Sequence, residues 1–493
     1  MKRGWVLAAL MLTMMLAAMD IAIVATALPQ IVSDLGGFNK ISWVFSIYLL
    51  AQTVTIPLYG KLADLFGRKG VLVVGVTLFL AGSAACAASW GIGALIAFRG
   101  LQGLGAGSIM ATVNTIAGDI YTVEERAAVQ GWLSSVWGVS AIVGPALGGA
   151  LVEYFNWRWI FLINLPIGMV AMFLLWRYFR EQVVRRPVKI DYEGAVLITA
   201  TLSLFFMFLL EGGQSWAWLS GESAALLAAV VVLAWWAVRV ERRAAAAIMP
   251  AWVWRNRTMV FTNLAVAAMG IVMMGPDTYL PTFTQASLGL GVIASGFVLA
   301  SMSIGWPTAS ALSGKLYLRI GFRETALIGS VLVLLASVAF LLIPAPQPIY
   351  LIVLDQVLIG AGFGLMFTPS LVGLQSMVAW EHRGVVTGAN IFCRNLGQSL
   401  GAAVMGAIFN NVFLGRLPLA PPGTPDSTNE VIKLIQAPGT APAVRTFLEN
   451  AVNASMRGAY WGMVAFSLLL FILLRLVPRR RPEGAALVGP DRT

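Results

Sequence analysis

Five charged side chains lie within the long apolar segments of this sequence, where charge is uncommon. They are Asp20, Arg99, Asp277, Asp355 and Arg394. A charge at the centre of a membrane costs about 2.5 to 3.5 kcal/mol on the insertion scale, so a residue that keeps one there is a candidate for function. A buried carboxyl group can bind and release a proton as its access to water changes, and a guanidinium nearby adjusts that exchange.

The depths of Asp20 and Arg99 predict that the two side chains interact. At 1.5 Å per residue, Asp20 lies about 22 Å from the start of the apolar segment 5–29. Arg99 lies about 10 Å from the start of the segment 92–118, which runs in the opposite direction. In a hydrocarbon core about 30 Å thick these heights are similar. We therefore expect Asp20 to be the main proton acceptor and Arg99 to tune it; the alternative is a purely structural salt bridge.

The composition requires that most of the chain lies in lipid. Of its 493 residues 59% are hydrophobic and only 11% are charged, with a mean hydropathy of +0.82. A water-soluble domain would have about 25% charged residues. The net charge of +11 does not indicate a nucleic-acid partner, because the cations form short clusters between apolar runs. The expected partner is the lipid bilayer.

Fourteen segments meet the requirement of about 20 mainly apolar residues for a membrane span. The sequence therefore predicts an all-α polytopic membrane protein. The expected helices lie near 5–29, 41–60, 70–89, 92–118, 130–152, 159–178, 192–211, 222–240, 258–282, 292–313, 324–343, 349–377, 384–411 and 458–477.

The distribution of Lys and Arg predicts the orientation. Alternate loops and the two tails hold 25 of the 33 cations, and the opposite loops hold six. Because cytoplasmic loops carry the excess of cations, both termini are expected in the cytoplasm. The chain is then a multi-pass protein of the cytoplasmic (inner) membrane, in our interpretation of a bacterium. The long hydrophilic connection 413–457, with two expected short helices near 427–436 and 441–453, is external.

A basic turn occurs twice and indicates a duplication. The run from Gly60 to Lys69 recurs from Gly314 to Arg323, 254 positions later, with Gly, Lys, Leu, Gly and a terminal cation in matching places. This offset is about two helices longer than six spans and their short loops, so the seventh and eighth spans are expected to be an insert between two six-helix halves. The expected parts are 1–185, 186–250 (the insert), 251–480 and the cytoplasmic tail 481–493.

Four strings occur in order on the expected helices. They are the first basic turn, Arg99–Gly107, Gly138 with Gly144–Gly149, and Trp157–Pro166. With them, nearly the whole chain resembles the fourteen-span drug/proton antiporters of the major facilitator superfamily. The resemblance implies two six-helix halves around a central cavity, the proton gradient as the energy source and no cofactor. Ala22 and Ala25 stand where that branch usually has Thr and Asn, so the substrate range is expected to differ.

The resemblance also implies a cytoplasmic gate at the first basic turn. Its residues are Gly60, Asp64, Gly67, Arg68, Lys69 and Asp119. An ion pair of Asp64 with Arg68 at the helix ends would hold the inward side shut and break on opening. For Lys69 and the other lysines, simple anchoring by the positive-inside rule is the alternative. Leu318 stands opposite Asp64 in the second turn, so the first half is expected to hold the stronger latch.

The fifth expected helix, 130–152, resembles the antiporter signature of the superfamily. Gly138, Gly144, Gly148 and Gly149 remove side chains, and Pro145 weakens one backbone hydrogen bond, which permits close helix contact and a local bend. In the resembled family this helix belongs to the moving interface between halves. Ordinary small-residue packing is the equal alternative.

The remaining charged residues have more open roles. Asp277 is either a contact for a cationic substrate or a solvated residue near the outer mouth, and Asp355 is a candidate substrate contact or second proton site. Arg394 is expected to be an interhelical lock. The sole histidine, His382, is expected in a loop, and no metal-ligand spacing occurs.

The expected function is efflux of lipophilic, in part cationic, compounds in exchange for protons by alternating access. No phosphate-binding Gly-Lys-Ser/Thr loop is present, which argues against an ATP-driven pump. The alternative within transport is export or uptake of a single metabolite. An enzyme would need a nucleophile and base, and a sensor would need a soluble domain; neither is found in the sequence. In a bacterium with two membranes, a periplasmic adaptor could extend the export path.

Overall fold

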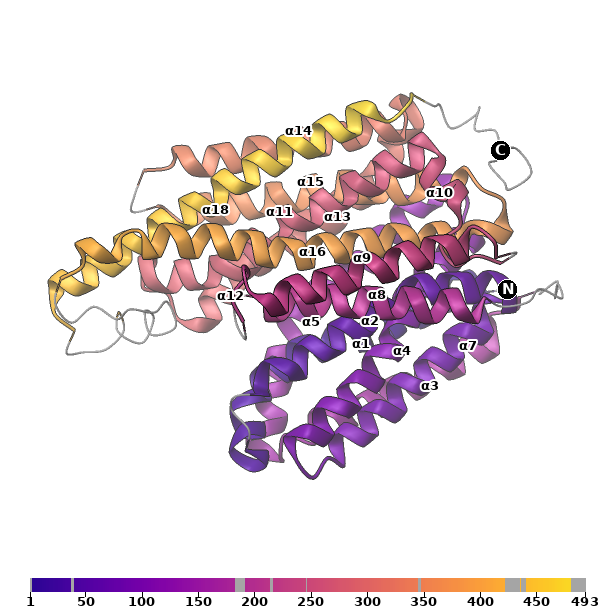
Figure 1. Ribbon diagram of the computed structural model, residues 1–493, viewed down its shortest axis with the longest axis horizontal. Helices are drawn as coiled ribbons and strands as arrows, with labels where there is room; N and C mark the ends of the chain where they lie inside the picture. The colour runs from indigo at the N-terminus through magenta and orange to yellow at the C-terminus, as the bar shows by residue number, and fades with distance from the viewer. Residues whose placement is uncertain are drawn as a thin grey trace. The chain divides into compact units, whose positions relative to one another are not determined.

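The computed structural model describes residues 2–36, 40–181, 191–212, 216–244, 246–344, 347–421, 435 and 440–479. These residues form helices joined by short connections (Figure 1), and they contain no β-strand beyond one isolated bridge between Gly212 and Trp216. The expected tail 481–493, the part 422–439 of the loop except residue 435, and with it most of the expected short helix near 427–436, lie outside the described residues.

The helices carry the following labels and bounds. They are α1 Arg3–Leu35, α2 Ile41–Phe66, α3 Arg68–Ala87, α4 Ile92–Ile120, α5 Val123–Tyr154, α6 Trp159–Leu162, α7 Asn164–Tyr178, α8 Tyr192–Glu211, α9 Gly221–Glu241, α10 Ala251–Arg255, α11 Arg257–Leu288, α12 Val292–Ala300, α13 Met302–Ile320, α14 Phe322–Leu342, α15 Ile349–Ser376, α16 Arg383–Leu414 and α18 Pro442–Leu476, with 3-10 turns at Trp380–His382 and Leu417–Leu419.

Thirteen helical stretches of the described chain are long and apolar enough to cross a membrane. The all-helical class is therefore confirmed, whereas the count of fourteen stays a prediction. The segment expected at 292–313 is two helices, α12 and α13, and is not among the thirteen. The physical reason is that α12 has only nine residues and α13 carries Pro307, Lys315 and Arg319.

Helix α18 corrects one boundary. The short helix expected near 441–453 is continuous with the last span, so that α18 runs over 35 residues from Pro442. A proline at the first turn favours a helix start, because its missing N–H would have no helical partner there. The loop expected to run to residue 457 therefore ends before Pro442, where α18 begins.

The two basic turns have the same backbone form. Gly67 separates α2 from α3 with φ +91°, and Gly321 separates α13 from α14 with φ +96°. Residues with a Cβ rarely adopt this left-handed region, whereas glycine does so at no steric cost. The repeated glycine thus lets one helix end and the next begin within a single residue.

By its internal contacts the chain divides into two compact units. Unit 1 includes residues up to Val260 together with Leu371–Phe392, and unit 2 is Phe261–Ser370 with Cys393–Arg479. The described helices of the expected insert, α8 and α9, belong to unit 1, where they pack side by side and α8 also contacts α2 (Figure 1). In unit 2, α14 packs along α18.

Candidate functional site

Asp20 and Arg99 form a fully buried ion pair in unit 1. Asp20 lies on α1 and Arg99 on α4, and neither side chain is exposed. Arg99 Nη1 donates a hydrogen bond to Asp20 Oδ2. The contact predicted from their depths is therefore confirmed, and it places an ionisable carboxyl group where water has no access in this conformation.

A second residue of α4 and side chains of two further helices, α7 and α3, complete the polar group around Asp20. Gln102 Nε2 donates to Asp20 Oδ1 over 2.7 Å, and Asn164 Nδ2 of α7 donates to the same oxygen over 3.2 Å. Both amides also donate to the Ser83 hydroxyl of α3, at 3.3 and 3.0 Å. Both oxygens of the Asp20 carboxylate thus accept hydrogen bonds, and these bonds join α1 to α4 and α7.

Arg99 is held by partners other than the carboxylate. Its Nε donates to the Val44 carbonyl of α2 at 3.1 Å, its Nη1 donates to Gln102 Oε1 at 2.7 Å, and its guanidinium lies 4.2 Å from the centre of the Tyr48 ring. Arg99 Nη2 is buried without a partner among the described residues. The N–H groups of this atom could therefore donate to a new acceptor if the helices repack.

Sequence reasoning missed the amide partners of this site. Gln102 follows Arg99 by three residues, a spacing that puts both side chains on one helix face, and this signal was available. Asn164 and Ser83 carry no such signal, because they reach the pair from α7 and α3 only through the tertiary packing.

Arg68 is the centre of a second buried cluster in unit 1. Its Nη2 donates to Asp64 Oδ1 at 2.9 Å and its Nε donates to Asp119 Oδ2 at 2.9 Å, and Arg68 is only 1% exposed. The guanidinium also donates to the Trp380 carbonyl at 2.5 Å and lies 3.6 Å from the centre of that indole ring. The expected Asp64–Arg68 pair is present, and Asp119 joins it.

The same carboxylates also bind the start of α16. Asp64 accepts the backbone N–H groups of Gly384 at 2.9 Å and Val385 at 2.8 Å, and Asp119 Oδ1 accepts Arg383 Nη1 at 3.1 Å. Free N–H groups at a helix N-terminus favour a negative charge. The cluster therefore joins α2, α3, α4 and α16, and its partners Trp380 and Arg383 were missed by sequence reasoning.

Gly60 explains how α2 comes so close to α16. A methyl group added at Gly60 would lie 2.5 Å from the Gly384 carbonyl oxygen and 3.3 Å from Gly388 Cα. Only a residue without a side chain fits between these backbones. The small residues thus set the distance at which Asp64 can reach the first turn of α16.

Lys69 has a different role from Arg68. Its Nζ donates to the carbonyls of Trp176, at 3.2 Å, and Phe179, at 2.6 Å, which end α7. In the second turn, Arg323 donates in the same way to the carbonyls of Leu474 and Arg475, at 3.2 and 2.8 Å. The last cation of each turn therefore caps the end of a helix.

Within the described residues, the second turn shows no counterpart of the Arg68 cluster. Phe322 stands at the position of Arg68 and packs against Tyr317, with ring centres 4.8 Å apart. Leu318, at the position of Asp64, is 38% exposed. The difference predicted from the missing Asp is thus present in the contacts of the two turns.

Two of the helix-5 glycines contact α1. A methyl group added at Gly144 would lie 2.7 Å from the Ala22 Cβ, and one at Gly148 would lie 3.2 Å from the Ile23 carbonyl oxygen. Gly138 is buried and Pro145 lies within the unbroken helix. Nothing lies within 4 Å of a methyl group added at Gly149, because one residue of an α-helix turns about 100° away from the face that packs on α1. The expected role of Gly149 in a moving interface stays a prediction.

Asp355 lies in a buried polar group in unit 2 and has no cation beside it among the described residues. Asp355 Oδ2 accepts the Tyr460 hydroxyl of α18 at 2.6 Å and the Gln356 amide at 3.0 Å, while Oδ1 has no partner there. Tyr460 stacks on Phe340 with ring centres 3.7 Å apart. Asp355 is therefore only 4% exposed, and its carboxyl group is surrounded by one hydroxyl group, one amide and aromatic rings.

Asp277 and Arg394 are partly buried, and their side chains make fewer contacts with other described residues than those of Asp20 and Asp355. Asp277 lies in α11 between Pro276 and Pro281, and no hydrogen bond to its side chain is found within the described chain. Arg394 donates to its neighbour Asn395 at 3.4 Å and lies 4.8 Å from the centre of the Phe367 ring of α15. Its contact with another helix is therefore a cation–π contact.

Thirteen membrane-length helical stretches in the described chain define the class as a polytopic membrane protein, and an ion pair buried at mid-helix is a feature that marks functional sites in such proteins. The family model described as Major Facilitator Superfamily matches residues 10–402. The chain belongs to this superfamily, which is a family of transporters.

Relatives in other organisms agree with this assignment. The chain is 33% identical over 83% of its length to multidrug transporter protein MdtP of Bacillus subtilis, covering 76% of that protein. It is 34% identical over 84% of its length to multidrug resistance protein 3 of the same organism, covering 81% of it. The solved structure of the human organic anion transporter MFSD10 matches 96% of this chain and all of that one with a TM-score of 0.65 at 14% identity, which supports the fold alone.

Proposed function

We propose that this protein exports lipophilic, in part cationic, compounds in exchange for protons by alternating access. The observation that carries the proposal is the Asp20–Arg99 pair, whose side chains are completely buried between α1 and α4. Two relatives named for multidrug transport support the substrate class. The energy source is then the proton gradient, and no cofactor is needed.

Protonation of Asp20 is the coupling step of this mechanism. When a proton neutralises the carboxylate, Arg99 loses its counter-charge while remaining buried beside Tyr48 and Val44. Removing one partner of a buried pair costs about 3 to 5 kcal/mol, enough to favour another arrangement of α1 against α4. A membrane potential supplies about 2.3 kcal/mol per charge per 100 mV, so one or two protons can drive such a change.

The Arg68 cluster is the gate in this mechanism. From the bias of Lys and Arg we infer that it lies, with both termini, on the cytoplasmic side. There it ties α2, α3 and α4 to the first turn of α16, and access from the cytoplasm requires these bonds to break. Asp64 and Asp119 would then release Arg383 and the N–H groups of Gly384 and Val385.

Asp355 is a second proton site under the same proposal. A carboxyl group buried with no counter-charge is costly in its ionised form and can stay neutral by holding a proton. Asp277, which is partly exposed and has no hydrogen-bonded partner within the described chain, suits contact with a cationic substrate instead.

The first test compares Asp20→Asn with Asp34→Asn. Asp34 also lies on α1 and also pairs with an arginine, Arg158 at 2.9 Å, but its side chain is 49% exposed. In inverted membrane vesicles, addition of a lipophilic cation should change the internal pH in the wild type and in Asp34→Asn. It should give no such change in Asp20→Asn, because the amide cannot carry the proton.

The same assay run over a panel of compounds separates the alternatives. Exchange with several unrelated lipophilic compounds supports drug efflux, and exchange with one metabolite only would replace it with a specific transporter. Full proton-coupled efflux by Asp20→Asn would refute the coupling role, whatever the substrate.

A further inference from the structure

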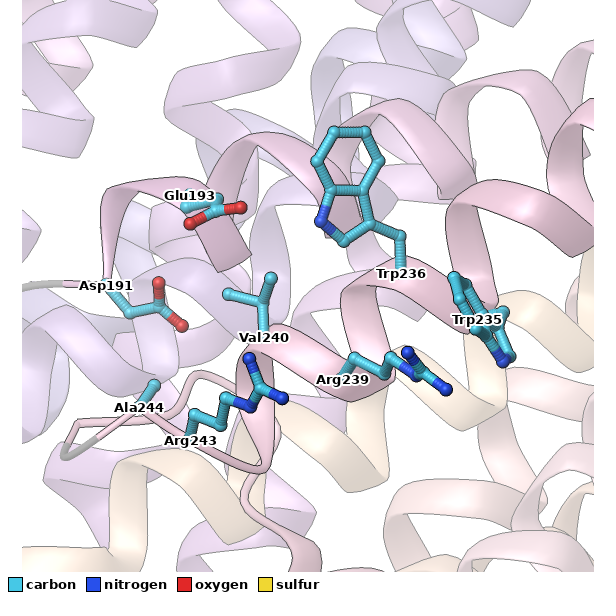
Figure 2. A pocket seen from close by; sticks show the side chains of 8 residues that line it. All are labelled: Asp191, Glu193, Trp235, Trp236, Arg239, Val240, Arg243 and Ala244. Atoms are coloured by element: carbon cyan, nitrogen blue, oxygen red, sulfur yellow. The ribbon is translucent and has the colours of Figure 1, made fainter.

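A cavity of about 500 Å³ lies between the beginning of α8 and the end of α9. Figure 2 shows the carboxylates of Asp191 and Glu193 on one side of it and the guanidinium groups of Arg239 and Arg243 across from them. Trp235 and Trp236 complete its lining. The cavity therefore has an acidic wall and a basic wall within one small space.

The two walls do not neutralise each other. Within the described residues no ion pair joins Asp191 or Glu193 to either arginine. One oxygen of Asp191 accepts the Gly194 N–H at 2.8 Å and so caps α8, while Oδ2 is buried and interacts with the Glu241 carboxyl group. Arg239 lies 4.0 Å from the centre of the Trp235 ring. Glu193, Arg239 and Arg243 are exposed, so one carboxylate and two guanidinium groups face the cavity.

The surroundings of the cavity favour a lipid over a freely dissolved compound. Helix α9 is one of the thirteen membrane-length helices, and only 17% of its apolar 18-residue stretch is buried in the protein. Val231, Val232, Trp235 and Trp236 of this helix are between 49% and 61% exposed. Tryptophan and arginine at the end of a span mark the level of the lipid headgroups. Apolar surface for acyl chains therefore continues directly from the charged cavity.

We propose that this cavity binds the headgroup of a phospholipid with a primary ammonium group, such as phosphatidylethanolamine. Arg239 lies in the last turn of α9 and Arg243 lies two residues beyond its end, and both line the cavity, where their guanidinium groups can donate to one phosphate. The ammonium group carries N–H donors for Glu193 on the opposite wall. A choline headgroup lacks these donors, and an anionic headgroup would leave the acidic wall without a positive partner.

The test measures lipid retention by the purified full-length protein. The protein is extracted into detergent containing equal amounts of phosphatidylethanolamine, phosphatidylcholine and phosphatidylglycerol, and bound lipid is counted by native mass spectrometry. The wild type should retain phosphatidylethanolamine about tenfold better than phosphatidylcholine. Arg239→Gln with Arg243→Gln should lose this retention, and Glu193→Gln should lose the preference between the two lipids.

Arg242→Gln is the matched control, because Arg242 is exposed and adjacent to Arg243 but does not line the cavity. It should behave as the wild type. Equal retention of both lipids by the wild type, or the same loss in Arg242→Gln, would overturn the proposal. Displacement of the lipid by an equal concentration of soluble glycerophosphoethanolamine would show that the ligand does not have to come from the membrane.

The variants change exposed side chains, and an unchanged midpoint of thermal unfolding verifies that they fold. Because no transport is measured, the result is independent of the proposed antiport.

Discussion

Asp20 and Asp355 are both buried carboxyl groups, but their surroundings differ. Asp20 has Arg99 as a counter-charge and two amide donors, whereas Asp355 has a hydroxyl and one amide and, within the described chain, no cation. A paired carboxylate can remain ionised in a buried site, while an unpaired one is far more costly unless it is protonated. Under the proposed antiport, we expect the two residues to hold protons in different states of one transport cycle.

This difference makes a prediction for Asp355→Asn. The amide has nearly the same shape and still accepts the Tyr460 hydroxyl, but it cannot carry a proton. We expect substrate exchange to continue with about one proton fewer per cycle, since the second proton site is lost. Parallel measurement of substrate flux and of the reversal potential in vesicles gives this ratio.

Tyr460→Phe is the control for Asp355→Asn. It removes the 2.6 Å hydrogen bond and leaves the carboxyl group, so the ratio should stay at the wild-type value. An unchanged ratio in an active Asp355→Asn protein would exclude Asp355 as a proton site and leave the role of Asp20 untouched.

At the scale of elements, the contact of α5 with α1 depends on which face each glycine occupies. Gly148→Val would place its side chain against Ile23 and Thr26 of α1, whereas Gly149→Val would enter open space. Overpacking of this kind costs about 1 to 3 kcal/mol. We expect Gly148→Val to lower the midpoint of thermal unfolding and to reduce efflux, and Gly149→Val to change neither.

Both substitutions add the same side chain at neighbouring positions of one helix, so differences in helix propensity cancel. Similar effects of the two would show that the α1–α5 contact is not what limits stability. Loss of efflux in Gly148→Val with an unchanged unfolding midpoint would instead indicate that the contact matters for motion alone.

The helix boundaries show which parts of the fold could be predicted from the sequence. Hydropathy located most of the long helices, because the energy of transfer to lipid depends on a run of about 20 neighbouring residues. It did not predict the break between α12 and α13 or the extension of α18 to Pro442. These depend on helix continuity and packing outside the apolar run, which hydropathy does not measure.

At the scale of the whole molecule, the repeated turn predicts unequal effects of one substitution in its two copies. Arg68 binds two carboxylates and a carbonyl and stacks on an indole, which a lysine cannot reproduce because its ammonium is a single point charge. Arg323 binds two helix-end carbonyls, as Lys69 already does in the first copy.

We therefore expect Arg68→Lys to reduce the efflux rate about tenfold and Arg323→Lys to change it less than about twofold. The measurement is efflux of a fluorescent lipophilic cation from loaded cells, normalised to the amount of protein in the membrane. Equal losses in the two variants would show that the halves contribute equally to gating.

The sequence by itself determined the helical class and the family, and it predicts the duplication and the charges within the membrane. These follow from local runs of apolar residues and from short repeated strings. Only the tertiary structure decided that Gln102 and Asn164 share the carboxylate of Asp20, and that Trp380 lies on Arg68, 312 positions away. The physical reason is that hydropathy reports whether a residue lies in lipid, whereas a side-chain contact depends on the depth and rotation of several helices at once.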